Sequence, residues 1–326
     1  LAGITPVAEK TAFTKNGSDA VLVSMRLARV VSGRPVVLSC GYHGWDERLL
    51  GGIPAPDDGV VPESAVVCDF GYDLALLERL IQRSGDRIAG VVVTPEPAFL
   101  DAAWLKRCGE IARSRGGLFI VDEVRCGMRV AWGGMHELAG IRPDLVVFSK
   151  ALANGFPLAA VCGPRDVMDA SRGTYVFGTF YNEAQALAAS AATLRLSRAH
   201  DTVGHMGRVG ARLARGLDER FEAHRVGART IGPPEMFEIV FDEFAVEGAF
   251  FDGCAARGVL FFEEDFQSVS LAHGDDELRE TLAVCDAVIA ALPANRGVDG
   301  VTDHALRAHA ERRMLRPGVL DVAAVR

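Results

Sequence analysis

Two short apolar runs, each ending at a charged residue, constrain the fold of this chain more than any other feature. They are Gly117-Leu-Phe-Ile-Val-Asp122 and Asp144-Leu-Val-Val-Phe-Ser-Lys150. Unbroken runs of β-branched and aromatic residues are typical of parallel strands that are buried on both faces. Parallel strands end at one edge of a sheet, where open α/β sheets place their ligand-binding groups. The pattern therefore predicts that Asp122 and Lys150 lie at the same edge.

A carboxylate and a lysine at two strand ends have two interpretations. They can form a structural ion pair, because buried charges are normally paired. They can also serve pyridoxal phosphate (PLP), which needs a lysine amine to form a Schiff base and an acidic partner that keeps its pyridine nitrogen protonated. The spacing of the two residues does not separate these interpretations, but the flanking residues favour the second.

Six short motifs in one order along the chain carry a resemblance to a known family. They are Lys15-Asn-Gly-Ser-Asp-Ala20, Gly41-Tyr-His-Gly-Trp45, Glu96-Pro97, Asp122-Glu-Val124, Ser149-Lys150 with Asn154-Gly-Phe-Pro157, and Gly178-Thr-Phe180. Over residues 13–290 the chain resembles the class III (ω-type) PLP-dependent aminotransferases of fold type I. Within that family it is most similar to the branch of glutamate-1-semialdehyde 2,1-aminomutase.

The pattern of elements and the resemblance agree on the fold class. Strands and helices alternate with short connections, which calls for a largely parallel sheet. The predicted strands are 35–40, 90–94, 117–122 and 144–149, and the predicted helices are 20–31, 73–83, 103–115 and 183–197. The resemblance implies an α/β fold of type I, with a mostly parallel central sheet, flanking helices and a smaller C-terminal α+β domain.

The resemblance also implies a division into domains. Residues 1–200 form a large PLP-binding domain, residues 201–291 form a helix and a small α+β domain, and residues 292–326 form a tail of unknown role. In the small domain we expect strands at 236–241 and 258–262. The chain begins without methionine, and its phosphate-type motif arrives by residue 16. We therefore expect a fragment that lacks an N-terminal segment, rather than a shortened homologue.

The resemblance assigns the catalytic roles to Lys150 and Asp122. It implies that Lys150 forms the Schiff base with PLP and moves the proton, and that Asp122 stabilises the pyridinium through a charge-assisted hydrogen bond. Gly17 and Ser18 become phosphate ligands at the start of a helix. From the residues alone, capping of the helix by Ser18 and Asp19 is the preferred explanation, and the resemblance reverses this preference.

The resemblance places further residues around the cofactor ring. Tyr42 stacks on one face of the ring, Val124 packs against the other, and Glu96 lies near the cofactor in a supporting role. Each also has a structural interpretation, as a loop anchor, a core residue or a strand-end carboxylate. For His43 we favour a structural hydrogen-bonding role over a catalytic one.

The resemblance implies a homodimer, in which Gly178 and Thr179 reach the phosphate in the neighbouring subunit. The usual Ser-Gly-Asn-Pro continuation is replaced by Tyr181-Asn-Glu-Ala184. A loop at 49–65 is expected either to border the substrate channel or to be a surface excursion.

Composition excludes some classes of protein and suggests a compartment. The net charge of −8 argues against a general nucleic-acid-binding protein. The sequence has no apolar span long enough for a membrane helix and no signal peptide. Its seven cysteines are scattered, without the spacing of a zinc site. We expect a cytoplasmic protein without a metal.

The substrate is less constrained than the cofactor. The acidic run Glu263-Glu-Asp265 stands where an arginine is common in relatives that act on amino acids. It is interpreted either as an exposed charged turn or as a neighbour of a cationic or polyhydroxyl substrate. We expect amino transfer from an amine donor to an aldehyde or ketone. The alternatives are intramolecular transfer, as in the aminomutase, and an inactive PLP-binding homologue that acts as a partner protein.

Overall fold

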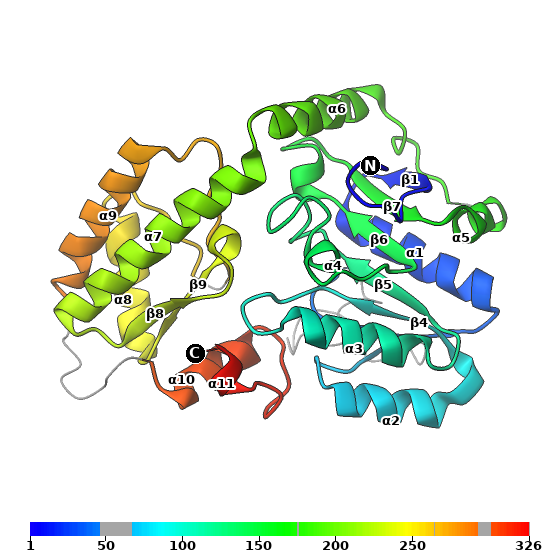
Figure 1. Ribbon diagram of the computed structural model, residues 1–326, viewed down its shortest axis with the longest axis horizontal. Helices are drawn as coiled ribbons and strands as arrows, with labels where there is room; N and C mark the ends of the chain where they lie inside the picture. Colours follow the sequence, from blue (N-terminus) through cyan, green and yellow to red (C-terminus); the bar gives the residue numbers. More distant parts are fainter. Residues whose placement is uncertain (46–66, 175, 264, 293–300, 326) are drawn as a thin grey trace. The chain divides into compact units, whose positions relative to one another are not determined.

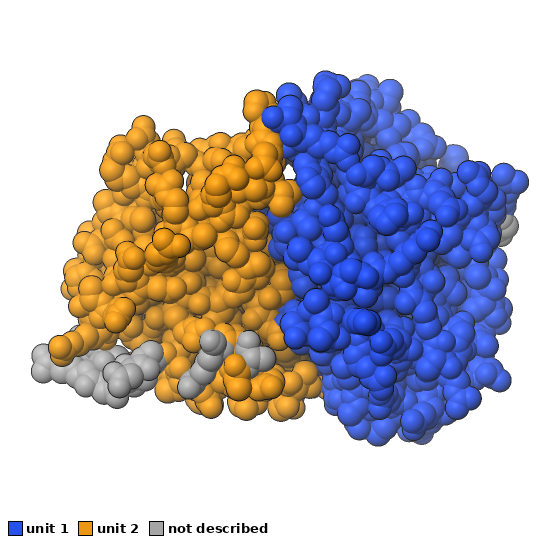
Figure 2. Space-filling model, in the orientation of Figure 1, with its two compact units in different colours: residues 1–96, 100–199 blue, residues 97–99, 200–326 orange. Residues whose placement is uncertain are grey.

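The computed structural model describes residues 1–45, 67–174, 176–263, 265–292 and 301–325. The loop expected at 49–65 lies outside these residues. The chain divides into two compact units, shown in different colours in Figure 2. Unit 1 comprises residues 1–96 and 100–199, and unit 2 comprises residues 97–99 and 200–326.

Unit 1 is built around a seven-stranded sheet with the order β1-β7-β6-β5-β4-β2-β3 (Figure 1). The strands are β1 (Lys10–Thr14), β2 (Val36–Cys40), β3 (Val67–Asp69), β4 (Ile88–Val93), β5 (Leu118–Asp122), β6 (Leu145–Phe148) and β7 (Ala159–Gly163). Neighbouring strands from β3 through β2, β4 and β5 to β6 pair in parallel. Strand β7 pairs antiparallel with both β6 and β1. The predicted mostly parallel α/β fold is confirmed.

The apolar runs form strands because both of their faces are buried. Leu145 and Val147 of β6 belong to a core cluster with residues of helix α1 (Gly17–Ser32). The alternate residues Val146 and Phe148 belong to a second cluster, on the opposite face. Since successive side chains of a strand point to opposite faces, only an unbroken apolar run fits this position. Strand β7 was not predicted, because Ala159–Gly163 is rich in small residues that lack strand propensity.

Helices flank the sheet of unit 1 (Figure 1). Besides α1 they are α2 (Leu74–Ser84), α3 (Ala102–Arg113), α4 (Met135–Leu138), α5 (Arg165–Asp169) and α6 (Ala184–Ala199). Helix α1 starts at Gly17, and its N-cap is Asn16, whose side chain accepts a hydrogen bond from the Asp19 N–H. The expectation that Ser18 and Asp19 cap this helix is therefore wrong, because both lie inside its first turn.

Unit 2 has a small α+β architecture. Its elements are α7 (Thr202–His224), β8 (Ala228–Ile231), β9 (Glu238–Phe241), α8 (Phe244–Ala255), α9 (Asp275–Ile289), α10 (Asp303–Arg312) and α11 (Val322–Val325). Strands β8 and β9 form a two-stranded antiparallel sheet. The hydrophobic core of unit 2 contains Phe221, Phe241 and Phe250, whose rings contact one another. None of the described helices of either unit is long and apolar enough to cross a membrane.

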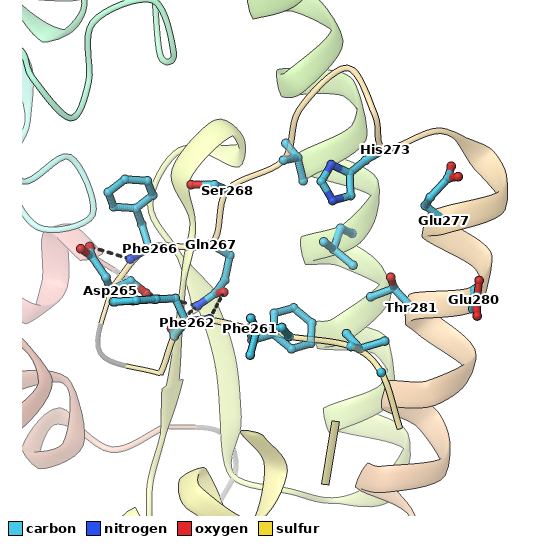
Figure 3. A pocket seen from close by; sticks show the side chains of 15 residues that line it. Phe261, Phe262, Asp265, Phe266, Gln267, Ser268, His273, Glu277, Glu280 and Thr281 are labelled. Atoms are coloured by element: carbon cyan, nitrogen blue, oxygen red, sulfur yellow. Dashed lines mark hydrogen bonds between the residues drawn. The ribbon is translucent and has the colours of Figure 1, made fainter. Parts of the chain in front are cut away.

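The strand expected at residues 258–262 is not present in the described structure. Gly258 has φ +86°, and the chain from residue 259 to 262 has no strand partner. Instead, the side chain of Gln267 accepts a hydrogen bond from the Phe262 N–H and donates one to the Phe262 carbonyl (Figure 3). A buried amide thus supplies the donor and acceptor that a neighbouring strand would supply.

Candidate active site

Asp122 and Lys150 line one cavity at the carboxyl end of the parallel strands. Asp122 ends β5 and lies opposite Val147 of β6, while Lys150 stands two residues after the end of β6. The cavity has a volume of about 370 Å³ and lies entirely within unit 1. It is lined by Lys15, Asn16, Gly17, Ser18, Tyr42, His43, Gly44, Asp122, Val124, Arg125, Ser149, Lys150, Gly155, Phe156, Pro157 and Leu158.

The backbone at Lys150 is strained. Its φ of +44° lies in the left-handed region, which a residue with a Cβ rarely adopts. A short 3₁₀ turn over Lys150–Leu152 begins here, and the Leu152 N–H donates to the Ser149 carbonyl. The Ser149 hydroxyl also donates to the Leu158 carbonyl at 2.9 Å. The two bonds brace the turn that brings Lys150 to the cavity.

Asp122 is almost fully buried and is hydrogen-bonded through both carboxylate oxygens. Its Oδ1 accepts from the Val124 N–H at 3.0 Å, and its Oδ2 lies 2.9 Å from His43 Nδ1. The Thr94 hydroxyl lies 3.2 Å from the same Oδ2. His43 therefore contacts Asp122 directly, in agreement with the expected hydrogen-bonding role.

The start of α1 forms another wall of the cavity. The N–H groups of Gly17 and Ser18 lie at the positive end of this helix, which attracts anions. A Cβ on Gly17 would lie 3.2 Å from a methyl group of Val124, and a Cβ on Gly44 would lie 1.8 Å from Ser18 Oγ. Glycines at 17 and 44 thus let the β5 end and the loop after β2 approach the helix start.

Tyr42 and Val124 both line this cavity, as the sequence predicts. The Tyr42 side chain is 45% exposed, while Val124 is partly buried and packs against the core cluster that includes α1. The two residues come from different strand ends, after β2 and after β5.

Glu96 does not line the cavity. It is buried and forms an ion pair with Arg125, which does line the cavity. Sequence reasoning did not single out Arg125, which is only 7% exposed. Its burial depends on which strands lie side by side, and a single segment of sequence does not show this. Next to Arg125, burial raises the pKa of the Cys126 thiol well above its ordinary value, so this sulfur stays protonated.

Gly178 and Thr179 do not line the cavity of Lys150. They line a separate cavity of about 530 Å³ in unit 1, with Phe177 and Phe180 nearby. Two contacts join residues of the second cavity to Lys15 and to the first turn of α1. Lys15, at the first cavity, pairs with Glu183, at the second, at 2.5 Å. The Tyr181 hydroxyl is hydrogen-bonded to Asp19 of α1, and burial followed by the Asp19 charge raises the pKa of this phenol.

A third cavity, of about 820 Å³, lies in unit 2 and contains none of the predicted cofactor ligands (Figure 3). Asp265 lines it and forms an ion pair with Arg313 at 2.8 Å. This carboxylate of the acidic run is therefore already neutralised within the chain. Glu264, the middle residue of the run, lies outside the described residues.

Comparison with known proteins identifies the family. A lysine and a carboxylate at adjacent strand ends, facing a helix start, are what PLP-dependent transferases of this fold need. The family described as aminotransferase class III matches residues 1–273. The chain belongs to the class III aminotransferase family. PLP is the cofactor of this family.

Three relatives illustrate the range of reactions near this sequence. The 2'-deamino-2'-hydroxyneamine transaminase of Streptomyces kanamyceticus is 40% identical over 239 residues, covering 73% of this chain and 60% of the transaminase. An aminopentol aminotransferase of Sphingopyxis macrogoltabida is 31% identical, covering 89% and 71%. The glutamate-1-semialdehyde 2,1-aminomutase of Thermomicrobium roseum is 30% identical, covering 87% and 74%. The chain thus spans only 60% of the length of the first relative.

A solved structure matches most of the chain. The FumI protein of Sphingopyxis sp. MTA144, in its PLP internal aldimine form, has a TM-score of 0.80 and 29% identity. The match covers 90% of this chain and 75% of FumI. Neither FumI nor the three relatives is described as an inactive homologue, so these proteins lend no support to that alternative.

The cavity of Lys150 fits PLP. Gly17 lies where a Cβ would already contact Val124, so backbone N–H groups can approach a phosphate closely there. The buried Asp122 carboxylate can accept a hydrogen bond from a protonated pyridine nitrogen. Lys150, which lines the same cavity, carries an amine of the kind that binds an aldehyde carbon as a Schiff base.

Proposed function

We propose that this protein transfers an amino group between an amine donor and an aldehyde or ketone of the aminosugar or aminopolyol type. The observation that carries the transfer chemistry is the convergence of Lys150 and Asp122 on one cavity beside the start of α1. Two relatives are named for transamination of a neamine derivative and of an aminopentol. These names support a polyhydroxylated substrate.

The residues of the cavity have defined roles in this proposal. PLP, when bound, supplies an electron sink for negative charge that develops on the substrate carbon. Lys150 anchors the cofactor, and its amine then moves the proton at the substrate carbon. Asp122 accepts a hydrogen bond from the pyridine N–H. Gly17 and Ser18 hold the phosphate through their backbone N–H groups.

The walls of the cavity orient the ring of the cofactor in this proposal. Tyr42 and Val124, which come from different strand ends, flank its two faces. Glu96 supports the site indirectly, because it forms an ion pair with Arg125 behind the cavity wall.

The charges around the cavity support a substrate without a carboxylate. Among the described residues that line it, Lys15 and Arg125 are the cations other than Lys150. Each of them forms an ion pair, Lys15 with Glu183 and Arg125 with Glu96. Binding a substrate carboxylate would have to compete with these pairs. An amine or carbonyl compound that carries hydroxyl groups and no carboxylate can bind without breaking either ion pair.

A homodimer and a cytoplasmic location are parts of the proposal. Phe177 and Phe180, beside Gly178 and Thr179, are 70% and 67% exposed in the single chain. A second copy would cover these rings and would let Gly178 and Thr179 approach the neighbouring cofactor. All seven cysteines are free thiols, which suits a reducing compartment. Equilibrium sedimentation and cell fractionation test these two statements.

The transfer can be measured in the reverse direction with neamine as the amine donor. The wild-type protein, loaded with PLP, is expected to convert 2-oxoglutarate to glutamate or pyruvate to alanine when neamine is present. The Lys150→Ala variant is expected to lose at least about 10³-fold in rate, since it lacks the proton-transferring amine. Product formation is followed by mass spectrometry. If the wild-type protein aminates neither acceptor with any of several aminosugars, the proposed substrate class is wrong.

Intramolecular transfer is the second candidate, because an aminomutase is among the relatives. The two reactions differ in the origin of the nitrogen. A transaminase places ¹⁵N from a labelled donor in its product, whereas an aminomutase moves the nitrogen already present in its substrate. Glutamate-1-semialdehyde, incubated with ¹⁵N-glutamate, separates them: an unlabelled rearranged product supports the aminomutase.

A further inference from the structure

Thr94 lies between the two strand ends that carry cofactor-contacting groups. It directly follows β4, which is flanked in the sheet by β2 and β5. Tyr42 and His43 follow β2, and Asp122 ends β5. The Thr94 side chain is inaccessible, with the residue only 1% exposed. A group at this position can contact both neighbours at once.

The backbone of Thr94 is fixed from two sides. Its N–H donates to the Cys40 carbonyl at 3.1 Å, and its carbonyl accepts from the Tyr72 hydroxyl at 2.9 Å. Tyr72 is fully buried, and a Cβ at Gly41 would lie 2.3 Å from its hydroxyl oxygen. Gly41 has φ +89° as well, so only glycine fits the turn above Tyr72.

The Thr94 hydroxyl has three polar neighbours but only one proton. Its Oγ1 lies 2.8 Å from the Tyr42 carbonyl oxygen, 3.1 Å from His43 Nδ1 and 3.2 Å from Asp122 Oδ2. The Tyr42 carbonyl can only accept, and it is the nearest acceptor, so it takes the proton. The lone pairs of Oγ1 then face His43 Nδ1. The hydroxyl thus accepts from the imidazole while it donates to the loop of Tyr42.

These contacts select one protonation pattern for His43. Two acceptors, Asp122 Oδ2 at 2.9 Å and Thr94 Oγ1, surround Nδ1. The other ring nitrogen, Nε2, is buried and has no hydrogen-bond partner among the described residues. Within the described structure a proton on Nε2 would therefore find no acceptor, whereas a proton on Nδ1 has two. This geometry favours the neutral ring with its proton on Nδ1.

We propose that the Thr94 hydroxyl is a positioning group for cofactor binding. It ties the loop of Tyr42 to the His43–Asp122 pair, and it holds the imidazole with its proton directed at Asp122. This sets the distance between a ring-stacking side chain and the carboxylate that meets the pyridine nitrogen. Any effect of Thr94 on amino transfer rests on the proposed function. The geometry of Thr94, His43 and Asp122 does not depend on it.

The experiment compares Thr94→Val, which removes the hydroxyl at nearly constant volume, with Thr94→Ser, which keeps it. Histidine-selective ¹⁵N NMR of the cofactor-free protein reports the tautomer of His43, with the signal assigned through a His43→Gln variant. Affinity for PLP is measured by equilibrium dialysis without any amine. Ser24→Ala is the matched control, since it removes another buried hydroxyl, which donates to the Val21 carbonyl of its own helix.

In the wild-type protein we expect the ¹⁵N pattern of an Nδ1–H imidazole. Thr94→Val should change that pattern and weaken PLP binding about 10- to 100-fold, as expected for loss of a group that orients a ligand-binding residue. Thr94→Ser and Ser24→Ala should keep wild-type affinity and pattern. A similar thermal unfolding midpoint of all the cofactor-free variants excludes general destabilisation.

Three results would overturn the proposal. The first is an Nε2–H imidazole in the wild-type protein, which needs no variant and therefore remains decisive if Thr94→Val does not fold. The second is wild-type affinity in Thr94→Val. The third is a serine variant as defective as the valine variant, because the hydroxyl would then not be the cause. None of these measurements uses a substrate, so failure of the proposed transfer reaction is recognised separately.

Discussion

At the scale of single residues, Asp122 and Glu123 show how two adjacent carboxylates acquire different tasks. Asp122 lines the cavity of Lys150. Glu123 is equally buried but accepts hydrogen bonds from the N–H groups of Met135 and His136, and from the His136 ring. The second carboxylate therefore holds the start of α4, and the first remains at the cavity. Their neighbours in space, rather than their chemistry, separate the two roles.

Replacement of Asp122 by asparagine tests its proposed partnership with the cofactor. Asp122→Asn keeps the shape of the side chain but removes its charge, and hydrogen bonds to charged groups contribute about 1.5–3 kcal/mol. We expect kcat to fall about 10- to 100-fold, measured in the neamine assay with saturating PLP. Asp144→Asn is the control, because Asp144 precedes β6 and bonds to Arg113 and the Phe119 N–H. A loss of equal size in both variants would contradict the assigned role.

Sequence reasoning reached some site residues and missed others for a physical reason. Lys150, Asp122 and Gly17 stand at predicted strand ends or at a predicted helix start, and all three line the cavity. The importance of Thr94 and the burial of Arg125 depend instead on which strand lies beside which. Strand order joins residues that are far apart along the chain, and periodicity within one segment does not contain this information.

At the scale of elements, an apolar run predicted a strand correctly where a neighbouring strand is present to pair with it. The runs that became β2, β4, β5 and β6 lie next to one another in the sheet, and both their faces are covered. The run at 258–262 is also apolar but has no strand partner in the described structure, and Gln267 bonds its backbone instead. Strand propensity reflects how well a residue packs beside a neighbouring strand. It therefore predicts a strand wrongly where a side chain, rather than a strand, bonds to the backbone.

The proposed phosphate site at the start of α1 can be tested by filling the space beside it. Gly17→Val adds a branched side chain where a Cβ would already lie 3.2 Å from Val124. It should fill the approach to the helix N–H groups, so PLP affinity is expected to fall at least about tenfold with the fold retained. Equilibrium dialysis measures the affinity, and circular dichroism measures the fold. Gly248→Ala is the matched control, because a Cβ there meets nothing within 4 Å. Unchanged affinity in Gly17→Val would exclude a phosphate site at this helix start.

At the scale of the whole molecule, the position of Thr179 raises the question of which subunit it serves. It lines a cavity other than that of Lys150 in the same chain, beside the exposed Phe177 and Phe180. In the proposed homodimer, Thr179 contacts the phosphate held by the neighbouring subunit. Each active site would then combine Lys150 of one chain with Thr179 of the other.

Mixed dimers distinguish this arrangement from one in which each chain is self-sufficient. Lys150→Ala and Thr179→Asp are each expected to be inactive alone, the second because a carboxylate repels the phosphate. When the two are co-expressed and assort at random, half of the dimers contain one chain of each kind. In these dimers one site carries both changes and the other carries neither, so about one quarter of the wild-type activity should return. The pair Lys150→Ala and Asp122→Asn should give no more activity than Asp122→Asn has alone, because both residues belong to one chain's site. Activity of Thr179→Asp alone, or no recovery in the first mixture, would show that Thr179 does not act across the subunit boundary.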